Sequence, residues 1–256
     1  MKPLIALAAL LVATAVLVAA PAARADDSGF RIQIGGLALV NGSGQPRTEA
    51  RAVTGFQAIA TRGSIKLVLR QGSREGVELS GDDNILSLIE TQVVDHGGVP
   101  TLEIGARRGT SMSPRLPLVA SVDLVTLKAI SIAGGGTVTS EALKTPTLKL
   151  SISGSATVKL HQLNADEVAT QVSGSGDIEF TGRATKLAVS VSGSGDVNTR
   201  GLEADDVSVN VAGSGDASVT ARKTLNVSIA GSGNVVYAGD ATVKSSIAGH
   251  GSVRKQ

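Results

Sequence analysis

The fold is decided by Val191-Ser192-Gly193-Ser194-Gly195-Asp196-Val197, a stretch that recurs with changes along the second half of the chain. Its copies stand 18 to 20 residues apart, measured between their leading glycines. These glycines are Gly134, Gly154, Gly174, Gly193, Gly213, Gly231 and Gly249. A repeat of about 20 residues is typical of a solenoid, in which each repeat forms one coil.

The residues before each Gly-Ser-Gly alternate in size and polarity. Leu187, Val189 and Val191 are apolar, whereas Ala188 and Ser190 between them are small. Period-two alternation with β-branched residues predicts a strand with one buried face. The glycines that follow are expected to turn the chain, because glycine tolerates positive φ and lets backbones approach closely.

One such strand cannot bury its apolar face alone, so successive coils are expected to stack. Ile152 should then lie next to Val172, and Val172 next to Val191, at the strand spacing of about 4.8 Å. A coil of this length is too short for a strand–helix–strand unit, which needs roughly 30 residues. The Leu-x-x-Leu-x-Leu pattern of leucine-rich repeats is absent. The sequence therefore predicts an all-β chain that forms a parallel β-helix with about 18–20 residues per coil.

The N-terminus has the features of a secretory signal peptide. Lys2 precedes the apolar run 4–20, and Ala23-Arg24-Ala25 is a small-x-small cleavage site. We predict that residues 1–25 are removed and that no membrane span remains; an uncleaved anchor is the alternative. The chain has no cysteine, which excludes disulfides and thiolate metal sites. The protein is therefore expected to be exported, to the periplasm or beyond the cell.

Charge and composition argue against nucleic acid as a partner. Lys2 and Arg24 leave with the signal peptide, so the mature chain carries 22 basic and 22 acidic residues. The whole sequence holds three Phe, one Tyr and no Trp, and it has no basic block. Nucleic-acid binding needs a basic face and, for single strands, stacking aromatics. A protein or glycan of the cell envelope is the expected partner.

The mature chain, 26–256, is predicted to be one domain with two unlike halves. Residues 126–256 form the Gly-Ser-Gly repeats, and residues 26–125 form a less regular, strand-rich half that could cover one end of the stack. Asn84–Val94 is the one window that permits a helix, although Thr91 and Val93 keep a strand open as the alternative. Arg107–Pro117, with Gly, Ser and two prolines, is predicted to be an exposed loop.

Several motifs together resemble a known family. They are Gly55-Phe56-Gln57-Ala58-Ile59, Gln71-Gly72, Gly81-Asp82-Asp83-Asn84 and the Gly-Ser-Gly-Asp copies. Over about Arg51 to Gln256 the chain resembles the bacterial head GIN domain family, described as heads of autotransporter adhesins. The resemblance implies a right-handed β-helix related in shape to pectin lyases. It also implies no conserved catalytic set, and a role in adhesion.

Candidate sites are few. Asp177, Asp196 and Asp216 occupy one position of the repeat, where stacked carboxylates could bind calcium. Thr, Asn and Ser fill that position in other copies, which favours hydrogen bonds within the turn instead. The remaining candidates are single residues without metal-site or catalytic spacing, and solvated surface positions are expected for all of them: His96, His161, His250, Arg183, Arg200 and Arg222.

The predicted function is binding or scaffolding at the cell envelope, without catalysis, cofactor or metal. A carbohydrate-active, pectin-lyase-like enzyme is one alternative. It would need clustered acids, a basic residue to take a proton and aromatic platforms for sugars. A purely structural envelope protein with no ligand is the other alternative.

The mature protein is predicted to begin at Asp26, because cleavage after Ala25 satisfies the small-x-small rule. Intact-mass measurement of the exported protein checks this directly. Retention of Met1–Ala25 in that mass would contradict it.

Overall fold

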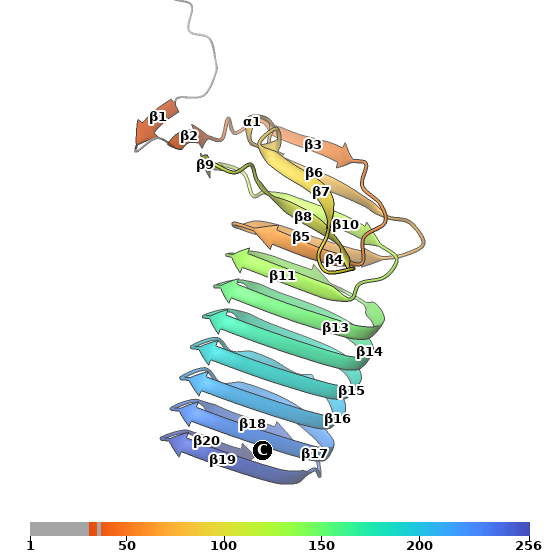
Figure 1. Ribbon diagram of the computed structural model, residues 1–256, viewed down its shortest axis with the longest axis vertical. Helices are drawn as coiled ribbons and strands as arrows, with labels where there is room; N and C mark the ends of the chain where they lie inside the picture. The colour runs from red at the N-terminus through yellow and green to blue at the C-terminus, as the bar shows by residue number, and fades with distance from the viewer. Residues whose placement is uncertain (1–30, 35–36) are drawn as a thin grey trace, which may run out of the picture.

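The computed structural model describes residues 31–34 and 37–256, which are almost entirely β-strand and form a solenoid of about six turns. The predicted signal peptide, 1–25, lies outside the described residues. Figure 1 shows the coils stacked along one axis, with the C-terminal coil at one end and a less regular group of strands at the other. The prediction of a parallel β-helix is confirmed.

The regular coils consist of long strands that bend around the stack. The first coil is formed by β11 (Ala129–Gly134) and β12 (Gly136–Ser140). The strands that follow are β13 (Leu143–Gly154), β14 (Thr157–Gly174), β15 (Asp177–Gly193) and β16 (Val197–Gly213). The last coils comprise β17 (Ala217–Gly231), β18 (Asn234–Ala238), β19 (Thr242–Gly249) and β20 (Ser252–Lys255). All of their pairings are parallel.

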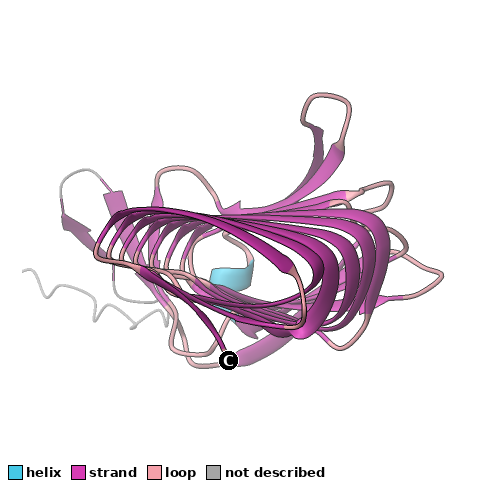
Figure 2. Cartoon of the chain, turned by 90° about the horizontal axis from the view of Figure 1, so that it is seen from below, coloured by secondary structure: helices cyan, strands magenta, loops and turns pink. Residues whose placement is uncertain are grey.

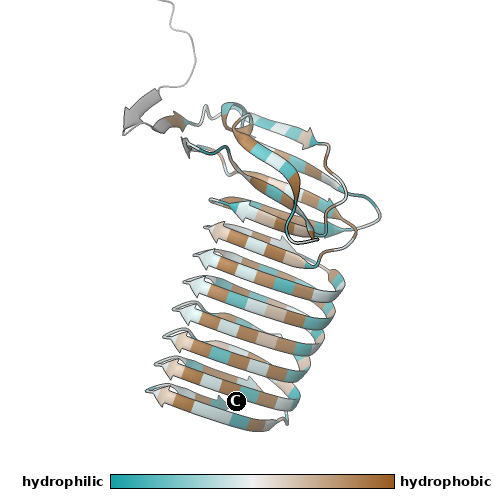
Figure 3. Ribbon diagram, in the orientation of Figure 1, coloured by the Kyte–Doolittle hydropathy of each residue, from teal (hydrophilic) through white to brown (hydrophobic). Residues whose placement is uncertain are grey.

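The core is a set of side-chain columns that run through the stack. Ile152 pairs with Val172, and Val172 pairs with Val191, as the repeat predicted. The column continues through Val211 and Ile229, and each of these five residues is at most 2% exposed. Burying one such side chain contributes about 1.5–3 kcal/mol, so repetition along the axis stabilises the whole stack. Figure 3 shows the resulting alternation of apolar and polar residues along each strand.

The leading glycine of each copy sits where a side chain has no room. Gly193 has φ +132°, and a Cβ there would lie 2.3 Å from the carbonyl oxygen of Gly174. The neighbouring Ser194 donates its N–H to the same oxygen at 2.9 Å. The close approach that excludes a side chain therefore also places a hydrogen bond between coils. The other leading glycines share the positive φ.

The second glycine of each copy is restricted by packing. A Cβ on Gly195 would lie 2.4 Å from the carbonyl oxygen of Gly176 and 2.8 Å from Cγ1 of Val172. The second glycine therefore faces the core side of the turn. Together the two glycines let the chain reverse within three residues and keep the coil flat, as the end-on view in Figure 2 shows.

The N-terminal part covers the first coil. β4 (Ala58–Arg62) pairs with β11, and β5 (Ile65–Gln71) pairs with β12, both in parallel. Beyond them parallel and antiparallel pairings mix. β10 (Val119–Leu124) pairs in parallel with β5 and antiparallel with β6 (Gly76–Asp82), and β3 (Pro46–Arg51) pairs antiparallel with the other edge of β6. This part therefore covers one end of the stack, as predicted.

The predicted helix window, Asn84–Val94, is mostly strand in the structure. The helix-permissive window gives a single helical turn, α1 (Asp83–Leu86), and then β7 (Ile89–Asp95), which pairs antiparallel with β8 (Pro100–Ala106). The strand alternative is thus right for most of the window, because its β-branched residues pair with β8.

The predicted loop 107–117 contains β9 (Thr110–Ser113), so the loop prediction is wrong there. β9 pairs with β2 (Leu37–Asn41), which itself pairs with β1 (Arg31–Ile34) in a separate three-stranded sheet. A partner distant in sequence makes these four residues a strand, and a local composition rule does not detect such a partner.

Gly193→Ala should destabilise the protein by several kcal/mol, because it combines a strained φ with a backbone overlap that no rotamer relieves. Gly72→Ala is the matched control, since no atom lies within 4 Å of a Cβ there. Chemical denaturation of both variants measures the difference. Equal midpoints would contradict the assignment of the glycine turn.

Candidate binding surface

The outward positions of the long strands form a flat surface of small side chains. We call it the outer face and define it by two register columns. The first column is Ala129, Lys149, Ala169, Ala188, Ser208, Asn226 and Lys244. The second is Ser131, Ser151, Gln171, Ser190, Asn210, Ser228 and Ser246. These residues are exposed or half-buried, whereas the residues between them in each strand face the core.

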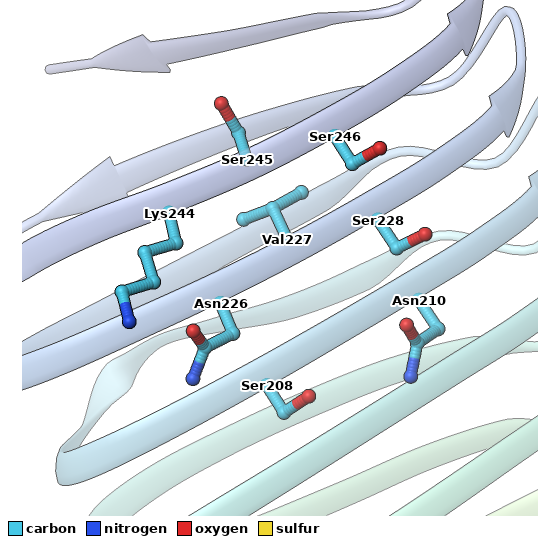
Figure 4. Close-up of a pocket in the computed structure, with 8 residues that line it drawn as sticks. All are labelled: Ser208, Asn210, Asn226, Val227, Ser228, Lys244, Ser245 and Ser246. Carbon is cyan, nitrogen blue, oxygen red and sulfur yellow. The ribbon is translucent and has the colours of Figure 1, made fainter.

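The outer face is hollowed along the stack. A shallow groove of about 540 Å³ crosses β11, β13, β14 and β15 and ends at Asn210. A second groove of about 240 Å³ begins at Asn210 and crosses β16, β17 and β19. Figure 4 shows the eight residues that line the second groove, contributed by these three neighbouring strands. The two grooves both border Asn210 and so follow one another along the outer face; we call them together the trough.

The chemistry of the outer face is neutral and able to form hydrogen bonds. Lys149 and Lys244 are the only charged residues in the two columns, and the columns contain no aromatic residue. Serine hydroxyls both donate and accept hydrogen bonds, as do the Asn and Gln amides. The face therefore offers hydrogen-bonding groups along its length, and its two columns hold no carboxylate or imidazole.

The predicted aspartate column has a structural use in the coils. Asp196 Oδ1 accepts the backbone N–H of Asp216 at 3.1 Å, and Asp216 Oδ1 accepts that of Asn234 at 2.7 Å. Ser252 Oγ continues the series by donating to Asn234 Oδ1 at 2.7 Å. The bonds reach the next coil, and not the backbone of the same turn as the sequence suggested. Within the described ranges, no group of three or more His, Cys, Asp or Glu is placed to hold a metal ion.

Two of the three predicted surface arginines, Arg183 and Arg222, lie at another corner of the coil, whereas Arg200 forms none of the ion pairs there. Arg222 Nη1 is 3.2 Å from Glu203 Oε2, and Arg183 Nε is 3.9 Å from the same oxygen. On the same corner, Lys223 Nζ and Asp205 Oδ2 are 2.8 Å apart. This hydrogen bond lowers the pKa of Asp205 and raises that of Lys223, although Lys223 is exposed and Asp205 only half-buried. These charges form ion pairs with one another and do not join the aspartate column.

The three histidines remain apart, as predicted. His96 Nε2 lies 2.9 Å from Glu103 Oε1, and Arg62 Nη1 lies 3.1 Å from Glu103 Oε2. The hydrogen bond from His96, followed by that from Arg62, lowers the pKa of Glu103. This cluster joins β8 to β4 in the N-terminal part. His161 and His250 lie in other coils, so the structure brings no two histidines together.

Asp82 is a buried carboxylate that the sequence analysis did not single out. Its oxygens accept the backbone N–H groups of Gly44 at 2.6 Å, Arg115 at 2.9 Å and Leu116 at 3.0 Å. Burial opposes the charged form, but these hydrogen bonds outweigh it, and the pKa of Asp82 lies below its ordinary value. Asp82 thus fastens two distant loops to β6 and α1.

Comparison with known proteins identifies the family to which the chain belongs. One family model, described as "Putative auto-transporter adhesin, head GIN domain", matches residues 55–241, which is most of the chain. The chain belongs to this family. The resemblance stated from the sequence motifs is therefore confirmed. No curated protein matches the sequence.

Solved structures of similar proteins agree with the head GIN fold. A protein from Bacteroides fragilis, described as a putative adhesin, is 25% identical, with a TM-score of 0.78 over 85% of this chain and 100% of its own. A putative lipid binding protein from Parabacteroides distasonis is 23% identical, with a TM-score of 0.69 over 85% and 99% of the two chains. A putative adhesin from Parabacteroides merdae is 22% identical, with a TM-score of 0.67 over the same shares. The two Parabacteroides proteins are less than 25% identical to this chain, so their similarity shows a shared fold alone.

Within the part of the head GIN chain that the structure describes, no helix is long and apolar enough to span a membrane.

Asp82→Asn should lower the melting temperature at neutral pH, because an amide nitrogen would face backbone N–H donors. The folded pKa of Asp82 is depressed, so its contribution is fully present above the unfolded value of about 3.9 and is lost as pH falls further. The difference between parent and variant should therefore shrink in thermal melts taken below about pH 4. A difference that stays constant down to pH 3 would contradict the role of the charge.

Calcium should leave the melting temperature of the parent unchanged, since Asp196 and Asp216 already accept hydrogen bonds from the next coil. Thermal melts in calcium and in chelator test this, beside a triple variant with Asp177→Ala, Asp196→Ala and Asp216→Ala. The triple variant should melt somewhat lower than the parent in both buffers. A calcium-dependent rise of several degrees that vanishes in the triple variant would show a metal site instead.

Proposed function

We propose that this head GIN protein is an exported, non-catalytic binding protein of the bacterial envelope, which attaches to a protein or glycan through its outer face. The family and the Bacteroides fragilis relative support adhesion in general terms. The predicted signal peptide supports export. The binding surface itself is inferred from the geometry of the coils.

The observation that carries this proposal is the trough of small polar side chains across the coils. Long side chains are rare in the two columns, so a partner can approach the sheet closely. Ser and Asn at matching heights offer similar hydrogen-bonding groups about every 4.8 Å along the axis. A partner with repeating polar groups, or a flat protein surface, can form many weak bonds to such a face at once. Multiple weak contacts suit attachment to an extended surface.

The carbohydrate-active alternative has less support. A lyase needs a general base beside acids that stabilise the charged intermediate. Asp196 and Asp216, which share one column, accept backbone hydrogen bonds, and Glu203 and Asp205 are paired with cations. Incubation with a panel of uronic-acid polysaccharides tests this alternative. Cleavage above background by the parent protein would overturn the non-catalytic proposal.

The proposed face is tested by adding bulk and charge to the trough. The double variant Ser151→Arg, Ser190→Arg changes two residues that line the larger groove. Ser218→Arg is the matched control, because it lies in the part of β17 that pairs with β18, on the opposite sheet. Binding of labelled mature protein to purified envelopes should fall at least about tenfold for the double variant and stay unchanged for the control.

Two outcomes of this experiment would contradict the proposal. If the parent shows no saturable binding to envelopes, a purely structural role is favoured. If the double variant and the control bind like the parent, the partner uses a different surface. Circular dichroism of each variant confirms that the coils remain folded.

A further inference from the structure

The C-terminal end of the stack presents an open strand edge. β19 pairs with β17 on one side, and β20 pairs with β18 on one side; among the described residues, neither has a pairing on its outer side. The end-on view in Figure 2 faces this last coil. An uncovered edge of this kind is a template for pairing with another strand.

The last coil also exposes apolar surface that is buried in every regular coil above it. Ile247 occupies the register position of Ile229 and Val211, which are 1% and 2% exposed, yet Ile247 is 42% exposed. Val243, in the same strand, is partly buried against the core. Between them, Ser245 stands where the coil above has Val227. The edge strand thus offers two aliphatic side chains around a small central residue.

The sequence of β19 is complementary to itself in one antiparallel register. With Ser245 opposite its own copy, Val243 lies opposite the partner's Ile247, Lys244 opposite the partner's Ser246, and Thr242 opposite the partner's Ala248. Directly opposed residues in antiparallel strands share a face, so core-facing residues meet core-facing residues. The two exposed Ile247 side chains would each be covered by a valine.

Other registers fit less well. Centring the pair on Lys244 would set two ammonium groups directly opposite each other, which is destabilising. Centring it on Ser246 would place Ile247 opposite Ser245 and leave Val243 opposite a glycine. The register centred on Ser245 is the one that matches apolar residues and separates the lysines.

We propose that two copies of this chain associate tail to tail, with β19 antiparallel to the partner's β19 and Ser245 on the twofold axis. Such an interface is isologous and closes at two copies, so it covers the edge without generating a fibre. Two lysines of the last coil are compatible with it, because Lys255 Nζ is 3.0 Å from Asp240 Oδ1 and Lys244 faces a serine. The outer faces of both copies would join into one longer surface with an N-terminal cap at each end.

A single introduced cysteine tests the register, since the chain has none of its own. In the proposed dimer the Cα atoms of the two Ser245 residues lie about 4.5–5.5 Å apart, within the range for a disulfide. Ser245→Cys should therefore yield a disulfide-linked dimer on mild oxidation. Ser228→Cys is the control: it is exposed, but three strand spacings, roughly 14 Å, separate it from its copy. Equal cross-linking of the two variants, or none for Ser245→Cys, would overturn the proposal.

Association itself is measured by analytical ultracentrifugation of the unmodified mature protein, which should form a dimer as concentration rises. Ile247→Lys should weaken the dimer at least about tenfold, because it places a charge against the partner's Val243. Ser228→Lys, one coil away from the edge, should leave association unchanged. A parent that stays monomeric at its highest soluble concentration, or an Ile247→Lys variant that dimerises like the parent, would overturn the proposal. Neither measurement depends on the envelope partner.

Discussion

In every regular coil the carbonyl oxygen of the leading glycine accepts a backbone N–H from the coil that follows. Six such bonds join the glycines from Gly134 to Gly231 to the residues after the next leading glycine, at 2.8–3.0 Å. They require backbones so close that a Cβ would overlap the neighbouring oxygen. Glycine at this position therefore fixes the turn, the spacing of the coils and the register between them. The valine and isoleucine columns depend on that register, because one residue of slippage would turn them outward.

The same constraint shapes the outer face. A tight glycine turn at one edge of each coil keeps the sheet flat, so outward residues of successive coils align in straight columns. Small side chains in those columns leave the trough that we propose as the binding surface. Charged residues gather at the opposite corner, where Arg222, Glu203 and neighbouring groups pair across coils. Exposed pairs of this kind contribute little to stability, so the fold depends mainly on the glycine turns and the apolar columns.

The repeat half could be read almost completely from sequence, because each coil carries the same local signals. The alternation around Val191 predicted the buried column, and the spacing of Gly193 from its neighbours predicted the coil length. The fold of the N-terminal part could be predicted less completely from the sequence. β9 and the placement of β10 between β5 and β6 depend on pairings between distant segments, which no local pattern contains. Asp82 and Glu103 were missed for a similar reason, because Asp82 accepts from Arg115 and Glu103 pairs with Arg62, and both partners lie far away in the chain.

The candidate surface could not be located from the sequence. The Gly-Ser-Gly repeat marks the turns, whereas the two columns of the outer face contain no glycine and follow only from the observed register. The aspartate column shows that a repeated residue in the sequence does not by itself reveal what the side chain binds. Its spacing allowed calcium as a hypothesis, whereas in the structure Asp196 and Asp216 each accept a backbone N–H from the next coil.

Hydrogen exchange at the residues after the leading glycines tests the central claim most directly. The amides of Ser175, Ser194 and Ser214 lie in glycine-rich turns beside exposed side chains, yet each donates to a carbonyl of the previous coil. We predict that these amides exchange as slowly as those of the neighbouring core strands, and far more slowly than the amides of the loop at residues 73–75. Exchange of the three serine amides at the rate of that loop would contradict the claim that hydrogen bonds from these amides to the glycine carbonyls of the previous coil hold the coils in register.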